Sequence, residues 1–260
     1  MKKLLLSIAI TAGFAGSALA ADLPVKAPAY APAPVATNWT GCYIGAGGGY
    51  GMWNQDHTTL DPRRIPFANQ FGAATTGGRG WFGTVQVGCD YQVAPRWVIG
   101  AFADGDYGSL TGNYAPSAIG TGAAFGQEKM RSSWAAGARV GYLVLPQLLT
   151  YVSGGFTQAR FNSITMATPV AGVTFVQDAA TYNGWFLGSG YEYGLDLLPG
   201  LFWKTEYRFS TYQSQQPALT LLTPTATTAI GFEDSKKYVQ TIRTELVYRF
   251  NWGGPIVARY

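Results

Sequence analysis

Strict two-residue alternation of side-chain type is the feature that most restricts the fold of this chain. In "LFWKTEYRF" (201–209), one set of alternate positions holds Leu, Trp, Thr, Tyr and Phe, and the other carries Lys204, Glu206 and Arg208. This period is typical of a β-strand whose two faces meet different environments. Alternation alone leaves two arrangements open. In a soluble sheet the charged face meets water, whereas in a membrane barrel the charged face points into the barrel.

Eight such runs follow one another, and the connections between them alternate in length. Three connections are short and carry Pro95, Pro146 or Pro199, and the other four are long and rich in Gly, Ala, Thr and Pro. This layout is typical of outer-membrane barrels. We therefore predict an all-β fold, an eight-stranded antiparallel transmembrane β-barrel with short periplasmic turns and four long extracellular loops. The runs cover residues 39–52, 79–92, 97–107, 129–143, 148–159, 182–195, 201–211 and 237–250.

The composition favours a wall that faces lipid. Charged residues make up 12% of the chain, against roughly 25% in ordinary globular proteins. Aromatic residues reach 15%, and there are 34 glycines. No segment has the ~20 uninterrupted apolar residues of a transmembrane helix. The formal net charge is +4, but no run of basic residues accompanies it, so we expect no nucleic-acid partner.

Both ends of the chain lie outside the predicted strands. Lys2 and Lys3 precede a short apolar run that ends in a small-x-small triplet at Ala20, which is typical of a secretory signal peptide. The next segment is rich in proline and alanine and is expected to be an extended tether. We predict a signal peptide at 1–20, a periplasmic tether at 21–38, the barrel at 39–250 and a C-terminal tail at 251–260.

The polar faces of the runs combine charges with glycines. Glycine weakens an ordinary strand, but it suits the interior of an eight-stranded barrel, which is just wide enough to be filled by side chains. We therefore predict that the charges point inward and neutralise one another, because a buried unpaired charge costs several kcal/mol. The predicted lumen network consists of the acids Asp90, Asp104, Asp106, Glu192, Glu206 and Glu245 and the bases Arg131, Arg139, Lys204, Arg208, Arg243 and Arg249.

Aromatic residues near the strand ends suit girdles at the two membrane interfaces. Trp39, Trp97, Trp203 and Tyr248 are examples. For any single one of them, ordinary packing within the sheet is the alternative.

Cys42 and Cys89 fall on the predicted lipid-facing side, near the same end of two neighbouring antiparallel strands. Cross-strand neighbours on one face have Cβ atoms roughly 4.5–5.5 Å apart, which is near the range that a disulfide needs. Exported proteins meet an oxidising compartment. We predict a Cys42–Cys89 disulfide; the alternative is two free thiols in the wall.

Five segments in order resemble a known family: "NWTGCYIGAGGGYG" (38–51), "VQVGCDYQ" (85–92), "ARVGYLV" (138–144), "FWKTEYRF" (202–209) and "TELVYRFNWGGPIVARY" (244–260). They resemble the porin-like outer-membrane immunogenic proteins of Gram-negative α-proteobacteria, which belong with the OmpA-type and opacity-type barrels. The resemblance covers the strands but not the long loops. It implies a non-enzymatic surface protein of the cell outer membrane that helps to maintain the envelope and exposes antigenic loops.

Such a protein is expected to contact outer-membrane lipid and lipopolysaccharide, the outer-membrane assembly machinery and, through its loops, a host or environmental ligand. Barrels of this kind usually end on an aromatic residue that the assembly machinery reads. Phe250 and Tyr260 are the two candidates for that signal.

Several functions stay open beside the structural one. The first alternative is a narrow porin-like diffusion channel for ions or small solutes. The second is an enzyme, for which His57 with Asp56 or Asp61 is the only candidate base. Ligand capture by the loops, for example of haem, is a third, and a soluble lipocalin-like carrier with the opposite strand parity is a fourth. We expect no catalytic residues, no cofactor and no metal, because the single histidine, His57, is predicted to lie in a solvated loop without partner ligands.

Overall fold

The computed structural model describes residues 38–61, 68–69, 74–114, 125–168 and 172–250. Among these residues, no helix is long and apolar enough to cross a membrane. The predicted signal peptide at 1–20, the tether up to residue 37 and the tail at 251–260, which includes Tyr260, lie outside the described residues.

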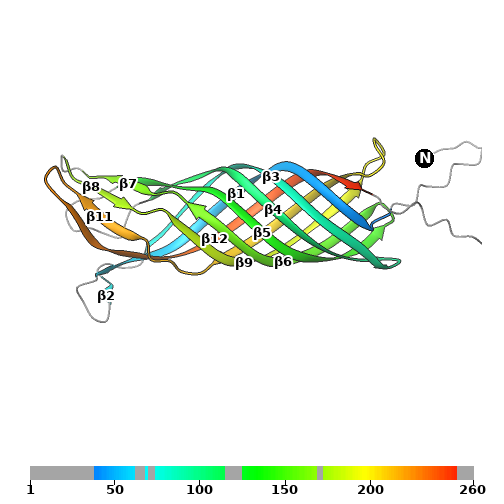
Figure 1. Ribbon diagram of the computed structural model, residues 1–260, viewed down its shortest axis with the longest axis horizontal. Coiled ribbons are helices and arrows are strands. Elements are labelled where there is room, and N and C mark those ends of the chain that lie inside the picture. Colours follow the sequence, from blue (N-terminus) through cyan, green and yellow to red (C-terminus); the bar gives the residue numbers. More distant parts are fainter. Residues whose placement is uncertain (1–37, 62–67, 70–73, 115–124, 169–171, 251–260) are drawn as a thin grey trace, which may run out of the picture. The chain divides into compact units, whose positions relative to one another are not determined.

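Eight antiparallel strands form one closed barrel (Figure 1), as predicted. Each barrel strand pairs with the next one along the chain, and the last pairs with the first from Cys42–Phe250 to Leu60–Phe232. Closure satisfies the backbone hydrogen bonds that an open sheet edge would expose to lipid. The barrel strands are β1 (Gly41–Asp61), β3 (Ala74–Ala94), β4 (Trp97–Tyr114), β5 (Gly126–Leu145), β6 (Leu148–Phe161), β9 (Ala180–Gly194), β10 (Leu201–Tyr212) and β12 (Thr227–Phe250).

Short turns join β3 to β4, β5 to β6 and β9 to β10 at one end of the barrel. At the other end the strands run well beyond the predicted limits: β1 continues to Asp61, and β12 already begins at Thr227. Four short strands extend the sheet there, so the predicted long loops partly consist of strands (Figure 1). These are β2 (Ala68–Asn69), β7 (Ile164–Ala167), β8 (Thr174–Gln177) and β11 (Ala218–Leu222).

The apolar faces of the strands form the outer wall. Trp203 is 47% exposed and Leu246 is 56% exposed, whereas Lys204 is only 1% exposed. A soluble carrier would show the reverse parity, with its charged residues in water. The burial pattern therefore excludes the lipocalin-like alternative.

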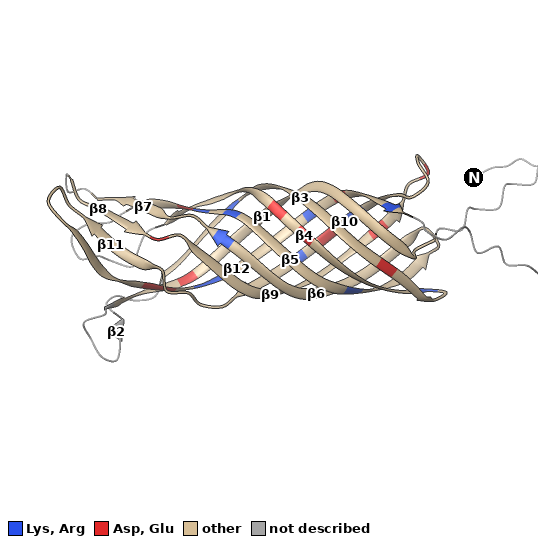
Figure 2. Cartoon of the chain, viewed as in Figure 1, with Lys and Arg blue, Asp and Glu red and all other residues tan. Residues whose placement is uncertain are grey.

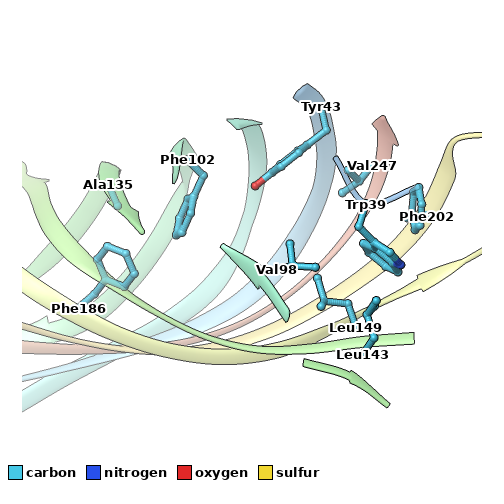
Figure 3. Close-up of a cluster of buried hydrophobic side chains, with 10 residues drawn as sticks. All are labelled: Trp39, Tyr43, Val98, Phe102, Ala135, Leu143, Leu149, Phe186, Phe202 and Val247. Carbon is cyan, nitrogen blue, oxygen red and sulfur yellow. The ribbon is translucent and has the colours of Figure 1, made fainter. Parts of the chain in front are cut away.

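Side chains fill the interior of the barrel in layers. A hydrophobic layer closes the short-turn end, and a second one, built around Trp53, Phe82 and Phe161, lies nearer the loops. Buried charged residues lie between and beyond these layers. Figure 3 shows the first layer, which contains Trp39, Tyr43, Val98, Phe102, Ala135, Leu143, Leu149, Phe186, Phe202 and Val247.

Trp39 belongs to this interior layer, so its prediction as an interfacial residue is wrong. Its side chain is fully buried, its Nε1 donates to the Pro146 carbonyl at 3.1 Å, and its ring lies 4.9 Å from that of Phe202. Gly41, two residues later, has a φ of 147° that other residues rarely adopt, and it lets the chain turn from the barrel mouth into β1. By contrast, Trp97 and Tyr248 are exposed on the outer wall.

Candidate functional site

The centre of the barrel holds a network of ion pairs between strands far apart in the sequence. Arg208 of β10 donates from Nη1 and Nη2 to the two carboxylate oxygens of Asp104 at 2.9 and 2.7 Å. Its Nη2 also lies 2.8 Å from Oε1 of Glu206. Arg243 of β12 reaches Asp104 at 3.2 Å and Asp106 at 3.1 Å. Figure 2 shows acidic and basic positions distributed along the barrel strands.

A second group of charges lies toward the short-turn end. Arg139 of β5 donates to both oxygens of Asp90, at 2.9 and 2.5 Å, and also contacts Glu192 at 3.0 Å. Arg249 of β12 bridges the same two acids, at 2.8 Å to Asp90 and 2.7 Å to Glu192. The Tyr43 ring packs against both guanidinium groups, 4.8 and 5.0 Å from their central carbons. The two acids and two bases therefore neutralise each other in a closed ring.

Lys204 extends the central group of charges. Its Nζ donates to the Gln86 side chain and lies 3.5 Å from Glu206 and 3.7 Å from Glu245. Tyr151 donates its hydroxyl to the same Glu206 oxygen that faces Lys204, Oε2, at 2.9 Å. Eleven of the twelve predicted lumen residues are thus buried inside the barrel.

Glycine makes room for these large charged side chains. A Cβ atom on Gly100 would lie 1.9 Å from Oδ1 of Asp90, and one on Gly190 would lie 2.7 Å from the Tyr151 hydroxyl. Both glycines face inward on strands next to the ion pairs. The mixture of glycine and charge in the sequence therefore has a steric origin.

Arg131 does not join the network, so its predicted place in the lumen is wrong. The residue is exposed on the outer wall. The register of β5 with β6 steps from Met130–Phe161 to Ser132–Arg160, which leaves Arg131 as an extra residue. A bulge of this kind reverses the parity of the residues beyond it. Met130 therefore points inward and Arg131 points outward.

A third polar group lies near the loop end, and the sequence prediction missed it. Lys237 lies 2.5 Å from Glu128 and donates to the Gln55 side chain. His57 Nδ1 lies 2.5 Å from Glu233 Oε1. Continuing the alternation of β1 and β12 past their predicted ends would have found His57 and Glu233, and Lys237 already lies within the predicted run 237–250. All three share the parity of inward residues.

His57 is consequently buried in β1 rather than solvated in a loop, which corrects its predicted position. Thr59 donates to the second oxygen of Glu233 at 2.9 Å. The ring of Tyr114 lies 4.9 Å from the His57 ring. Tyr114 ends β4 beyond the aromatic residues of the outer wall, and burial, followed by the charge of Glu233, raises the pKa of its hydroxyl far above its usual range.

The arrangement does not pair His57 with Asp56, one of the two combinations proposed as the base of an enzyme. Asp56 lies on the outer face, where it accepts a hydrogen bond from Thr75 at 2.8 Å, while His57 points inward. The two residues therefore cannot form a dyad. Asp61 ends β1, and its side chain is not described. In the described part of the chain, no group of three or more His, Cys, Asp or Glu residues could hold a metal ion.

Cys42 of β1 and Cys89 of β3 are joined in a disulfide on the outer wall near the short-turn end. The two residues are direct partners in the strand register. The covalent bond therefore links two strands that already pair. It lies outside the lumen, so it does not block or line a path along the barrel axis.

No family model matches the chain. The chain is 30% identical to the 31 kDa outer-membrane immunogenic protein of Brucella melitensis biotype 1 over 256 residues, which cover 96% of this chain and 100% of that protein. The protein of the same name from Brucella suis biovar 1 gives the same values.

Solved outer-membrane proteins show a looser likeness. The attachment invasion locus protein Ail of Yersinia pestis is 9% identical, with a TM-score of 0.35 over 80% of this chain and 99% of that one. The outer-membrane protease OmpT of Escherichia coli is 10% identical, with a TM-score of 0.40 over 80% and 97%. Neisserial surface protein A is 10% identical, with a TM-score of 0.36 over 81% and 98%. At these scores the likeness carries no conclusion about mechanism.

The sequence relationship extends over nearly the whole chain, and the relatives are named as outer-membrane proteins. The barrel, its apolar wall and its exposed aromatic residues agree with that location. The chain belongs to the outer-membrane immunogenic protein family and is an eight-stranded β-barrel of the outer membrane.

Proposed function

We propose that this protein is a non-enzymatic, structural barrel with a closed lumen, which supports the integrity of the envelope and presents antigenic loops outside the cell. The observation that carries the proposal is the filling of the lumen: every buried lysine and arginine of the described residues lies within 4 Å of a carboxylate. A selective open pore needs a polar path that ions can enter and leave. The hydrophobic layers at two depths support the absence of such a path between the ion pairs.

The paired charges of the lumen also oppose its opening. Removing one partner of a buried pair leaves an uncompensated charge, which is strongly destabilising. Each pair therefore resists the side-chain movement that a conducting path would need. Arg243, for example, would have to leave both Asp104 and Asp106.

Planar-bilayer recording of the purified, refolded protein tests the closed lumen. We expect no reproducible unit conductance from protein whose heat-modifiable migration on a gel shows that it is folded. The matched control is a Trp39→Ala variant, which removes the side chain that closes the short-turn end. Reproducible unit conductance from the unmodified protein would refute the closed lumen in favour of the diffusion channel.

A deletion strain tests the envelope role. We expect greater sensitivity to detergent and to large antibiotics, and recovery when the intact chain is supplied. Unchanged permeability in the deletion strain would contradict the role in envelope integrity. Unchanged lipid-A mass spectra with and without the protein are expected from a non-enzymatic barrel.

Phe250 is the better supported candidate for the assembly signal. It is the last residue of β12, it is 41% exposed on the outer wall, and its ring packs against Tyr248 at 5.1 Å. Replacing Phe250 with alanine is expected to lower the amount of protein assembled in the membrane, measured by heat-modifiable migration. A variant that lacks Tyr260 serves as the comparison. A larger loss of assembled protein in that variant than in the Phe250 variant would assign the signal to Tyr260.

A further inference from the structure

Five basic side chains face outward at the loop end of the barrel wall. They belong to four strands, and each is exposed or half-buried. We refer to them together as the basic belt: Arg79 of β3, Lys129 and Arg131 of β5, Arg160 of β6 and Lys236 of β12.

The basic belt lacks the acidic partners that the interior bases have. Among the described residues, none of the five side chains lies within ion-pair distance of a carboxylate, and the one close partner of Lys236 is the Tyr238 ring at 5.5 Å. Asp56 stands near Lys236 in the strand register, but its Oδ1 accepts a hydrogen bond from Thr75. The belt therefore presents five basic side chains, none of which forms an ion pair with a described carboxylate.

The belt lies just beyond a row of exposed aromatic side chains. Arg79 is two residues nearer the loops than Trp81 on β3, and Arg160 is four residues nearer the loops than Phe156 on β6. Trp81 is 74% exposed and Phe156 is 43% exposed. Outward-facing aromatic residues mark the membrane interface in barrels. The belt therefore lies at the level of the lipid head groups.

Two hollows on the outer wall lie within the belt. One has a volume of about 450 Å³, and its lining includes Lys236 together with Asn183, Gln213 and Trp185. The other has a volume of about 490 Å³ and brings Arg79 together with amide side chains and glycines. Each hollow combines a cation with amides, which suit phosphate and hydroxyl groups respectively. The amides of the second hollow are those of Asn113 and Gln127.

The opposite end of the wall has no such belt. Among the described residues near the short turns, Arg96 is the sole outward-facing base, and its Nη1 donates to the Tyr142 hydroxyl at 3.0 Å. The group of several outward-facing bases is thus confined to one end of the wall. A general attraction to any membrane surface would not need this asymmetry.

We propose that the basic belt binds the phosphorylated sugar head groups of glycolipids of the lipopolysaccharide class in the outer leaflet. Arginine and lysine form charge-assisted hydrogen bonds with phosphate. The amides of the two hollows are placed to bind sugar hydroxyls, and the exposed Trp185 face offers an apolar surface for a sugar ring. The inference specifies a partner for the proposed structural role, but it does not depend on the lumen being closed.

Binding of bisphosphorylated lipid A to the detergent-solubilised full chain, followed by native mass spectrometry and tryptophan fluorescence, tests the proposal. The test variant is Arg79→Gln/Arg160→Gln/Lys236→Gln, and the matched control is Arg96→Gln at the other end. Since each basic residue near an anionic surface contributes to binding, we expect the triple variant to bind at least about tenfold more weakly. The control is expected to bind like the unmodified protein, and both variants should keep heat-modifiable migration.

Additional ligands separate head-group recognition from other sources of binding. Dephosphorylated lipid A and phosphatidylcholine are expected to bind both proteins weakly and equally. Equal affinity of the unmodified protein and the triple variant for bisphosphorylated lipid A would overturn the proposal. So would inorganic phosphate that displaces lipid A at equal concentration, because the site would then recognise a free anion rather than a glycolipid. Conductance in bilayers would refute the closed lumen without changing the measured binding of lipid A. A failure of the proposed closed lumen can therefore be distinguished from a failure of the proposed lipid site.

Discussion

The bases inside the barrel and the bases on its outer wall differ in what neutralises their charge. Inside, Arg208 and Arg249 each contact two carboxylates at short distance. Outside, Arg79 and Arg160 meet no carboxylate of the described residues. The bases of the interior are therefore neutralised by carboxylates of the protein itself. The bases on the wall at the loop end depend on the surrounding medium for neutralisation.

The difference follows from the solvent on each side. The charged side chains of the lumen are buried, and a buried charge without a partner is costly. An exposed base next to an interface can be neutralised by lipid or counterions and contributes little to folding. Four substitutions sharpen this comparison, from the largest expected effect on stability to the smallest.

Arg208→Met is expected to have the largest effect. It keeps much of the side-chain volume but leaves Asp104 and Glu206 short of a partner, which should lower the free energy of unfolding by about 3–5 kcal/mol. Urea unfolding in detergent micelles, followed by tryptophan fluorescence, measures the change. Arg160→Met on the outer wall is the matched control. Equal losses in the two variants would contradict the difference between interior and wall.

Removal of the disulfide with Cys42→Ala/Cys89→Ala is expected to have the next largest effect. The bond closes a loop with a sequence separation of 47, and its loss should lower the free energy of unfolding by about 2–4 kcal/mol. The same unfolding experiment, run with and without reductant, measures it. We expect reductant to destabilise the unmodified protein and not the variant. Because the bond lies on the wall, bilayer conductance should stay unchanged.

Tyr182→Phe removes one hydrogen bond from the polar group at the loop end. The Tyr182 hydroxyl lies 2.6 Å from the Ser235 Oγ, and both groups are buried. Leaving the Ser235 hydroxyl without this partner should cost about 1–2 kcal/mol. The double variant Tyr182→Phe/Ser235→Ala, which removes both hydroxyls, should recover part of the loss. No recovery would show that the hydroxyl pair itself is unimportant.

Arg131→Gln is expected to have the smallest effect, less than about 0.5 kcal/mol, because the bulge turns this side chain outward. Arg139→Gln, eight residues later and inside the lumen, is the comparison on the same strand. If Arg131→Gln destabilises the barrel as much as Arg139→Gln, the bulge is misplaced and Arg131 belongs in the lumen.

The sequence predicts the barrel well wherever lipid on one side and a packed lumen on the other enforce alternation. In β10, for example, Trp203 and Lys204 take the sides that their chemistry requires. Beyond the apolar band both faces of the strands carry polar residues, as around His57 and Thr59. Polar and apolar residues no longer alternate there, so the sequence predicted loops where the structure has strands. The outward position of Arg131 depends on a β-bulge, which the sequence pattern does not predict. The position of Trp39 depends on the turn at Gly41, which brings the tryptophan into the mouth of the barrel. From residue type alone, a tryptophan near a strand end is expected at the membrane interface.

The placement of the two surfaces is tested most directly by a pair of single-tryptophan variants. One keeps only Trp39 and the other keeps only Trp203, with the remaining tryptophans replaced by phenylalanine. The two side chains lie at the same end of the barrel, one fully buried and one 47% exposed. In bilayers of brominated lipid we expect strong quenching of Trp203 fluorescence and little quenching of Trp39. Strong quenching of Trp39 with protection of Trp203 would contradict the arrangement of an apolar wall around a filled, charged interior.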